Sequence, residues 1–148
     1  MTFEYSDAWL LEAIKFSEDG DKGSTLTDII QAADYINHAI ITNSEFATGT
    51  RKLKSIGLII EEDKRLRTTE KFNEWWTEKY GQKSRISVLK AMEEIENYLN
   101  KNFGTIEKQS TVTTTEITDT DLDKATKEYL KMASVTVEKL TKKKKEKG

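Results

Sequence analysis

The sequence contains no cysteine and no proline, and its single histidine is His38. Without cysteine, disulfides, thiolate nucleophiles and cysteine-type zinc sites are excluded. A lone histidine cannot form a histidine cluster, so we expect His38 to be a surface or structural residue. The sequence also has neither a phosphate-binding glycine loop nor a plausible nucleophile–base pair. We therefore expect a protein that is not an enzyme and that uses no cofactor and no metal.

Long apolar runs are missing as well. No stretch approaches the roughly 18 apolar residues that a membrane-spanning helix needs. Residues 1–5 carry neither the basic region nor the apolar region of a secretory signal. These absences predict a cytoplasmic protein with no membrane contact.

The apolar residues are concentrated in the first half of the 148-residue chain and become sparse after Phe103. This distribution predicts a compact domain at 6–80, a helical C-terminal arm or small subdomain at 82–140, and a disordered lysine-rich tail at 141–148. Charge is divided too, because residues 1–80 hold 10 Lys and Arg against 15 Asp and Glu. An acidic first half weighs against DNA binding, since phosphate neutralisation supplies most non-specific affinity for DNA.

The spacing of apolar residues and turn signals predicts six helices and one hairpin. The hairpin consists of residues 58–60 and 65–68 around a charged tip. The helices are expected at 7–16, 25–36, 43–56, 70–80, 83–101 and from about 119 onward. Gly49 falls in the middle of the third helix, where it costs about 1 kcal/mol relative to alanine, and this predicts the close approach of another backbone. For Thr105–Thr118, a weak strand and a linker remain open alternatives.

Two groups of residues invite a functional interpretation that must be weighed against a structural one. Trp75 and Trp76 are flanked by Glu74 and Glu78, whereas a stacking platform for single-stranded nucleic acid needs basic surroundings. We therefore expect the tryptophans to pack in the core or at an interface. The carboxylates at 119, 121 and 123 lack the glycine and the glutamate of a calcium loop, so they are predicted to form an acidic helix N-terminus.

The order helix, loop, helix, turn, helix, hairpin, helix resembles the winged helix-turn-helix superfamily. The segment Arg51–Ile59, with its leucine, glycine and Leu-Ile pair, is similar to the end of the third helix in that superfamily. The segment Arg65–Phe72 resembles the second wing strand and its Leu-x-Thr exit into the next helix. The resemblance covers about residues 6–80. It implies a mainly α fold with a small β-hairpin wing, that is, a winged helix-turn-helix followed by a helical C-terminal extension.

In this superfamily the third helix commonly enters the major groove and the wing touches the neighbouring backbone. The resemblance therefore implies base contacts from the outward face of the third helix and phosphate contacts from its lysines and from the wing. The base candidates are Ser44, Thr48 and Arg51. The phosphate candidates are Lys52, Lys54, Lys64, Arg65 and Arg67.

Acidic residues stand where DNA would approach: Glu45 begins the third helix, and Glu61, Glu62 and Asp63 form the wing tip. Two hypotheses therefore stay open. The leading one is a non-enzymatic, DNA-binding transcriptional regulator that forms a homodimer through its later helices, because operators are often two-fold symmetric. The alternative is a winged-helix protein–protein interaction module without DNA binding, which would dock its partner through the aromatic helix at 70–80 or through the later helices.

Overall fold

The computed structural model describes residues 2–104 and 113–146, with side chains as far as Val135. It confirms a mainly helical fold with one small two-stranded antiparallel hairpin. The elements, in chain order, are α1 (Tyr5–Ser17), η1 (Gly20–Lys22), α2 (Leu26–Asn37), α3 (Asn43–Ser55), β1 (Ile59–Glu62), β2 (Arg65–Thr68), α4 (Glu70–Tyr80), α5 (Val88–Phe103) and α6 (Asp119–Glu146).

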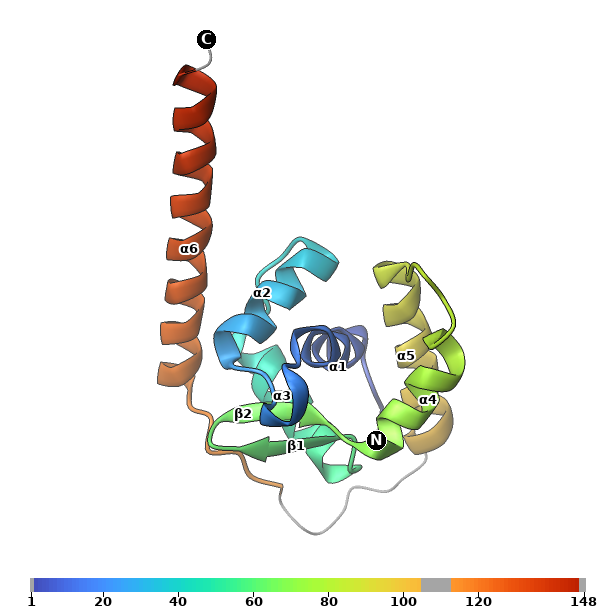
Figure 1. Ribbon diagram of the computed structural model, residues 1–148. Helices are drawn as coiled ribbons and strands as arrows, with labels where there is room; N and C mark the ends of the chain where they lie inside the picture. Colours follow the sequence, from blue (N-terminus) through green and yellow to red (C-terminus); the bar gives the residue numbers. More distant parts are fainter. Residues whose placement is uncertain (1, 105–112, 147–148) are drawn as a thin grey trace.

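Helix α1 lies at the centre of the body, with the other elements arranged around it (Figure 1). Every residue from Ser6 to Ile14 is buried, because α2, α3, α5 and β2 all pack against this helix. The indole nitrogen of Trp9 donates to the carbonyl oxygen of Ala33 at 2.8 Å, so a buried polar group is satisfied while α1 is fixed to α2. The predicted helix at 7–16 is therefore enclosed by its neighbours.

Helix caps explain where the first three helices begin. Glu4 and Asp7 form a reciprocal capping box at the start of α1, and Thr25 accepts from the backbone N–H of Asp28 at the start of α2. Helix α3 begins with a capping box between Thr42 and Glu45. Glu45 therefore satisfies a backbone donor of its own helix, which is a structural reason for an acid at this position.

The hairpin turns through Asp63 and Lys64, which both have positive φ values, 52° and 59°. Two successive residues with positive φ match the right-handed twist of the flanking strands. The register pairs Ile59 with Thr68 and Glu62 with Arg65. An isolated antiparallel bridge joins Ser24 to the other edge of β2, so the hairpin is tied back to the loop before α2.

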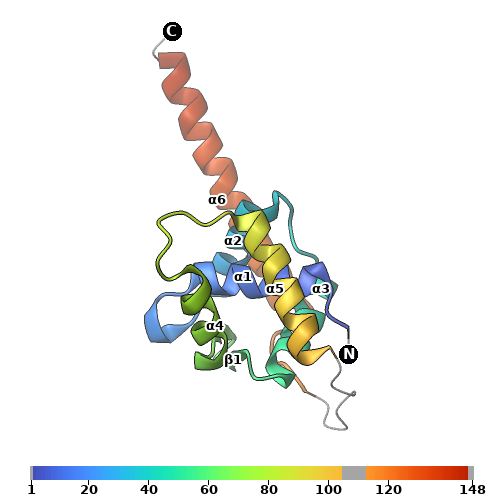
Figure 2. The same ribbon diagram turned by 90° about the vertical axis from the view of Figure 1, so that its right-hand side faces the viewer.

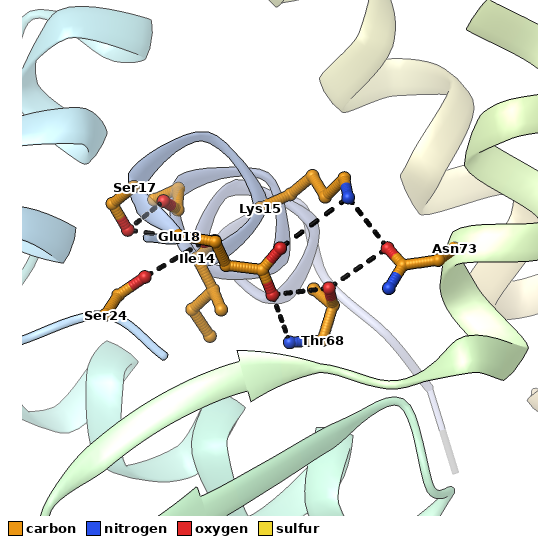
Figure 3. Close-up of polar contacts among 8 residues, drawn as sticks. Ile14, Lys15, Ser17, Glu18, Ser24, Thr68 and Asn73 are labelled. Carbon is orange, nitrogen blue, oxygen red and sulfur yellow. Dashed lines mark hydrogen bonds and ion pairs between the residues drawn. The ribbon is translucent and has the colours of Figure 1, made fainter. Parts of the chain in front are cut away.

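Figure 3 shows the polar contacts that fasten the end of α1 to this hairpin. The carboxylate of Glu18 accepts from both the backbone N–H and the hydroxyl of Thr68. Lys15 reaches Glu18 at 3.6 Å and donates to the side chain of Asn73 at 2.9 Å. Glu18, the residue after α1, joins α1 to β2, and Asn73 of α4 joins this network through Lys15 and Thr68. No periodicity marks such a residue, because its partners lie far away in sequence.

Helices α4 and α5 lie next to each other (Figure 2), and their aromatic side chains are in contact. Trp75 stacks on Tyr98 with ring centroids 4.6 Å apart, while Phe72 and Trp76 are buried. The tryptophans are therefore packing residues. Helix α5 also packs on α1, and Asn100 exchanges two hydrogen bonds with the backbone of Phe3. Buried residues of α5 thus belong to the same hydrophobic core as those of α1.

Gly49 lies where α3 crosses α1. A Cβ atom at this position would lie 2.8 Å from Cδ2 of Leu10, and Leu10 is fully buried. The predicted close approach is real, but the neighbour is a core side chain and not another backbone.

Helix α6 begins on the flank of α2 and extends beyond the body (Figures 1 and 2). Its first turns bury Leu122 and Ala125. Where the sequence predicts a disordered tail from 141, the helix continues to Glu146, because lysine and glutamate are good helix formers and neither proline nor glycine interrupts. Residues 147–148, and residues 105–112 of the threonine-rich stretch, lie outside the described residues.

Candidate nucleic-acid interface

The outward face of α3 carries three exposed polar residues: Ser44, Thr48 and Arg51. Their spacing, i, i+4 and i+7, places them in one row along the helix. The opposite face buries Phe46 and Leu53 in the core. Among the side chains that the structure describes, which extend to Val135, no group forms a hydrogen bond or an ion pair with the three exposed side chains. The helix therefore presents them to solvent as the sequence predicts.

Lys52 lies on a different face of α3. Its Nζ is 3.0 Å from a carboxylate oxygen of Asp7, a residue whose side chain is 2% exposed. The same Nζ donates to the carbonyl oxygen of Thr2 at 2.9 Å. A lysine that neutralises a buried carboxylate has a structural task, so the structure separates Lys52 from the other predicted phosphate contacts.

Lys54 contacts the segment that leads into α6, and Lys64 contacts the first turn of α6. Lys54 Nζ lies 3.3 Å from Glu61 and donates to the carbonyl oxygen of Thr114 at 2.6 Å. Lys64, at the hairpin turn, lies 3.1 Å from the carboxylate of Asp121. The two lysines thus belong to one surface, which the chain itself occupies.

Arg65 and Arg67 lie on the face of β2 that points away from the core. The strand alternates, with Leu66 and Thr68 buried and the two arginines outward. Glu61 is the cross-strand partner of Leu66, so the two side chains lie on the same face of the hairpin. Lys54 pairs with Glu61 and therefore approaches the hairpin from the face opposite the arginines. Neither arginine forms an ion pair within the described part of the chain. The predicted basic residues are consequently divided between several surfaces.

The segment from residue 113 to Tyr129, which we call the acidic arm, runs along β1 and then past the start of α3. The carboxylate of Glu61 accepts from the hydroxyl of Thr115 and from the backbone N–H of Glu116. Further on, the side-chain amide of Asn43, the first residue of α3, donates to Asp123 at 2.8 Å. The arm therefore bridges the hairpin and the N-terminal end of α3.

Hydrogen bonding keeps the carboxylates of this contact ionised. Bonds from the backbone N–H and the hydroxyl of Thr118, with a further bond from Lys64, lower the pKa of Asp121 to about 2. Burial acts to raise the pKa of Glu61, but bonds from Thr115, Glu116 and Lys54 outweigh it and leave this pKa below its ordinary value. Both groups are anionic at neutral pH, so the contact is an arrangement of fixed charges.

Sequence reasoning missed the arm and its contact residues. Asn43 and Glu61 are ordinary polar residues in the sequence, and their partners lie 80 and 54 residues away. The only available signal was compositional: a run of carboxylates at 119–123 and lysines at 54 and 64, with opposite charge. Charge complementarity alone does not determine which pairs meet.

A second polar feature lies inside the body. The side chain of Glu12 is fully buried, and neither of its carboxylate oxygens has a hydrogen-bond partner in the described residues. Burial raises the pKa of Glu12 to about 8. Burial also raises the pKa of Tyr80, helped by the charge of Glu12, and the Tyr80 hydroxyl is likewise unpartnered. The described residues contain no group of three metal-ligating side chains, so Glu12 is an isolated buried acid.

His38 ends α2 in the left-handed conformation with φ of 52° and is exposed, as expected for a surface histidine. No helix in the described ranges is both long and apolar enough to cross a membrane.

Comparison with known proteins gives no relative from which identity could be transferred: no protein-family model, no curated protein and no solved structure matches this chain.

Proposed function

We propose that this protein is a non-enzymatic, DNA-binding transcriptional regulator of the winged helix-turn-helix type. In this proposal α2 and α3 form the helix-turn-helix, the β1–β2 hairpin is the wing, and α3 enters the major groove. The observation that carries it is the row of Ser44, Thr48 and Arg51, which is exposed on α3 and used by no other part of the described chain.

Each residue of the row has a chemistry suited to DNA. The guanidinium of Arg51 offers the planar pair of donors that matches O6 and N7 of guanine. The hydroxyls of Ser44 and Thr48 reach either base edges or phosphate oxygens. Lys54 and Lys64 would supply point charges for the backbone, whereas Arg65 and Arg67 lie on the outward face of the wing and would meet only flanking DNA.

A duplex titration over a salt series tests the proposal. The full chain should bind random duplex at low salt, and log K should fall linearly with log salt concentration as counterions are released. Arg51→Ala combined with Thr48→Ala should weaken binding and reduce the slope of log K against log salt concentration by about 1, because one cation is lost. Arg85→Ala is the matched control, because Arg85 is also exposed and lies in the connection between α4 and α5. Absence of binding by the wild type at low salt would refute DNA binding.

A protein-docking module is the second candidate, and one observation favours it. Phe16 and Tyr35 are 43% and 73% exposed, and they line a shallow hollow with Asp28, Gln31 and Ala32. Large exposed aromatic side chains are enriched where proteins bind one another. The packed aromatic residues of α4 do not provide such a surface. If the wild type does not bind duplex, the hollow at Phe16 and Tyr35 becomes the leading site.

We further propose that the regulator is a homodimer through α6. The part of this helix beyond the body exposes Leu130 at 50%, and Ala133, Val137 and Leu140 continue the same row along the sequence. An isolated helix is marginal in water, so stability must come from packing of an apolar face. A second α6 would provide it.

A further inference from the structure

We infer that the acidic arm, residue 113 to Tyr129, is an autoinhibitory mask that competes with DNA for the surface formed by the wing and the N-terminal end of α3. The inference rests on the proposed DNA-binding function and adds the regulation of that site.

The arm lies between the start of α3 and the turn of the wing. Asn43, which donates to Asp123, immediately precedes Ser44, the first residue of the exposed row. Lys64, which pairs with Asp121, lies at the turn of the wing. The two aspartates therefore span the interval between recognition helix and wing. A DNA backbone that contacts both elements must cross this interval.

The arm offers lysines the same kind of acceptor atoms as a DNA backbone. A phosphate oxygen and a carboxylate oxygen accept the same charge-assisted hydrogen bonds from lysine. Lys64 donates to Asp121 at 3.2 Å, and Lys54 donates to a backbone carbonyl of the arm at 2.6 Å. Both lysines thus make with the arm the kind of contact that they would make with phosphates. Duplex DNA would have to displace these acceptors.

The aspartates of the arm also repel DNA phosphates. Asp119, Asp121 and Asp123 follow one another in the first turns of α6, and Asp119 and Asp123 are exposed. With the arm seated, a phosphate that approached the start of α3 would meet the like charge of Asp123, which accepts from Asn43 at 2.8 Å. This repulsion is released only when the arm leaves.

The arm is bound to the body by few enough contacts for DNA to displace it. The body holds it through three buried side chains, Ile117, Leu122 and Ala125. Its polar contacts are mostly exposed, such as that between Thr27 and Glu128, although the bond from Tyr129 to Asp34 is partly buried. Exposed ion pairs contribute only about 0–1 kcal/mol each. A polyanion that offers several phosphates at once can outcompete such contacts.

Two double variants of the full chain test the mask. Asp121→Ala with Asp123→Ala removes the carboxylates that hold Lys64 and Asn43. Glu116→Ala with Asp119→Ala removes the same charge from the same segment, but neither of those side chains forms a hydrogen bond or an ion pair with the wing or α3 in the described structure. We expect about 10-fold tighter duplex binding from the first pair than from the second, within the range of ordinary allosteric coupling. Circular dichroism establishes that both variants are folded.

A reversible crosslink between α3 and the arm provides a complementary test. Because the chain has no cysteine, Asn43→Cys with Asp123→Cys creates a unique thiol pair between α3 and the arm. Joining the thiols with a short, reducible crosslinker should abolish duplex binding, and reduction of the same sample should restore it.

The outcomes separate the mask from the function. If the wild type and all variants, crosslinked or reduced, bind duplex equally, DNA binding stands and the mask is refuted. If both double variants tighten binding to the same extent, net charge explains the effect and the contact does not. If no form of the protein binds duplex at low salt, the proposed function fails and the mask fails with it.

Discussion

The ammonium group of Lys52 lies 3.0 Å from the buried carboxylate of Asp7 and thereby joins α3 to the first turn of α1. Removing the cation would leave a carboxylate in the core with no countercharge, and breaking a buried ion pair in this way costs about 3–5 kcal/mol. We therefore predict that Lys52→Met lowers the free energy of unfolding by about 3 kcal/mol, measured by urea denaturation.

Arg51→Ala serves as the neighbouring control for this measurement. Arg51 is exposed and forms no ion pair in the described structure, so its loss should change stability by less than about 0.5 kcal/mol. If Lys52→Met is as mild as Arg51→Ala, the pair with Asp7 is not important for stability, and Lys52 returns to the set of residues available for DNA.

Because Glu12 is buried, we predict that the free energy of unfolding falls as pH rises from about 4.5 towards 8. Burial raises its pKa in the folded state from 4.5 to about 8, so the folded protein retains a proton that the unfolded chain has lost. The contribution of this group to stability is therefore complete below pH 4.5 and is lost as pH rises towards 8, by up to about 1.4 kcal/mol per pH unit. Glu12→Gln should flatten the unfolding free energy over this interval and make the protein more stable at pH 8.

The comparison must be made over the whole pH range, because other groups titrate too. Glu74→Gln is a suitable control, since Glu74 is exposed on α4 and should leave the pH profile unchanged. A wild-type profile that keeps its slope in the Glu12→Gln variant would contradict the assignment to Glu12.

Tyr129 provides a test of how α6 is attached. Its hydroxyl donates to the carboxylate of Asp34 on α2, and this bond, with burial and the charge of Asp34, raises the pKa of Tyr129 to about 12. The stabilisation is complete below pH 10 and is lost as pH rises from 10 to 12. Ultraviolet absorbance should show a tyrosine that titrates near 12 and is missing in Tyr129→Phe.

The same variant should also loosen the helix. Loss of one hydrogen bond to a charged group costs about 1.5–3 kcal/mol, and backbone amides in the first turns of α6 should then exchange faster with deuterium. Tyr35→Phe is the control, because Tyr35 is 73% exposed and its hydroxyl has no partner in the described part of the chain. Equal exchange in the two variants would contradict the proposed attachment.

Local signals in the sequence predicted most of the elements but not the contacts between them. Apolar spacing located α1, α2 and α3, and the charged run at 61–64 marked the hairpin, because each signal arises within one element. The start of α5 was predicted five residues too early, at 83 instead of Val88, since a polar connection can carry amphipathic spacing by chance.

The candidate site was predictable only in its exposed half. Helical spacing alone places Ser44, Thr48 and Arg51 outward. The states of Lys52, Lys54 and Lys64 depend on Asp7, Glu61 and Asp121, and these pairings are set by how separate elements pack. A basic residue in a sequence carries no mark that distinguishes a structural cation from one available to a ligand.

The proposed homodimer predicts an unusual response to salt. Leu130, Ala133, Val137 and Leu140 follow the alternating three- and four-residue spacing of a coiled-coil seam, and the lysines at 142–145 would meet their counterparts in a parallel pair. Screening weakens repulsion between exposed like charges, so dimerisation should strengthen as salt rises, whereas DNA binding weakens. Sedimentation at tens of micromolar, at low and high salt, measures this directly. Leu130→Glu with Val137→Glu should give only monomer, and a wild type that is monomeric under both conditions would refute the dimer.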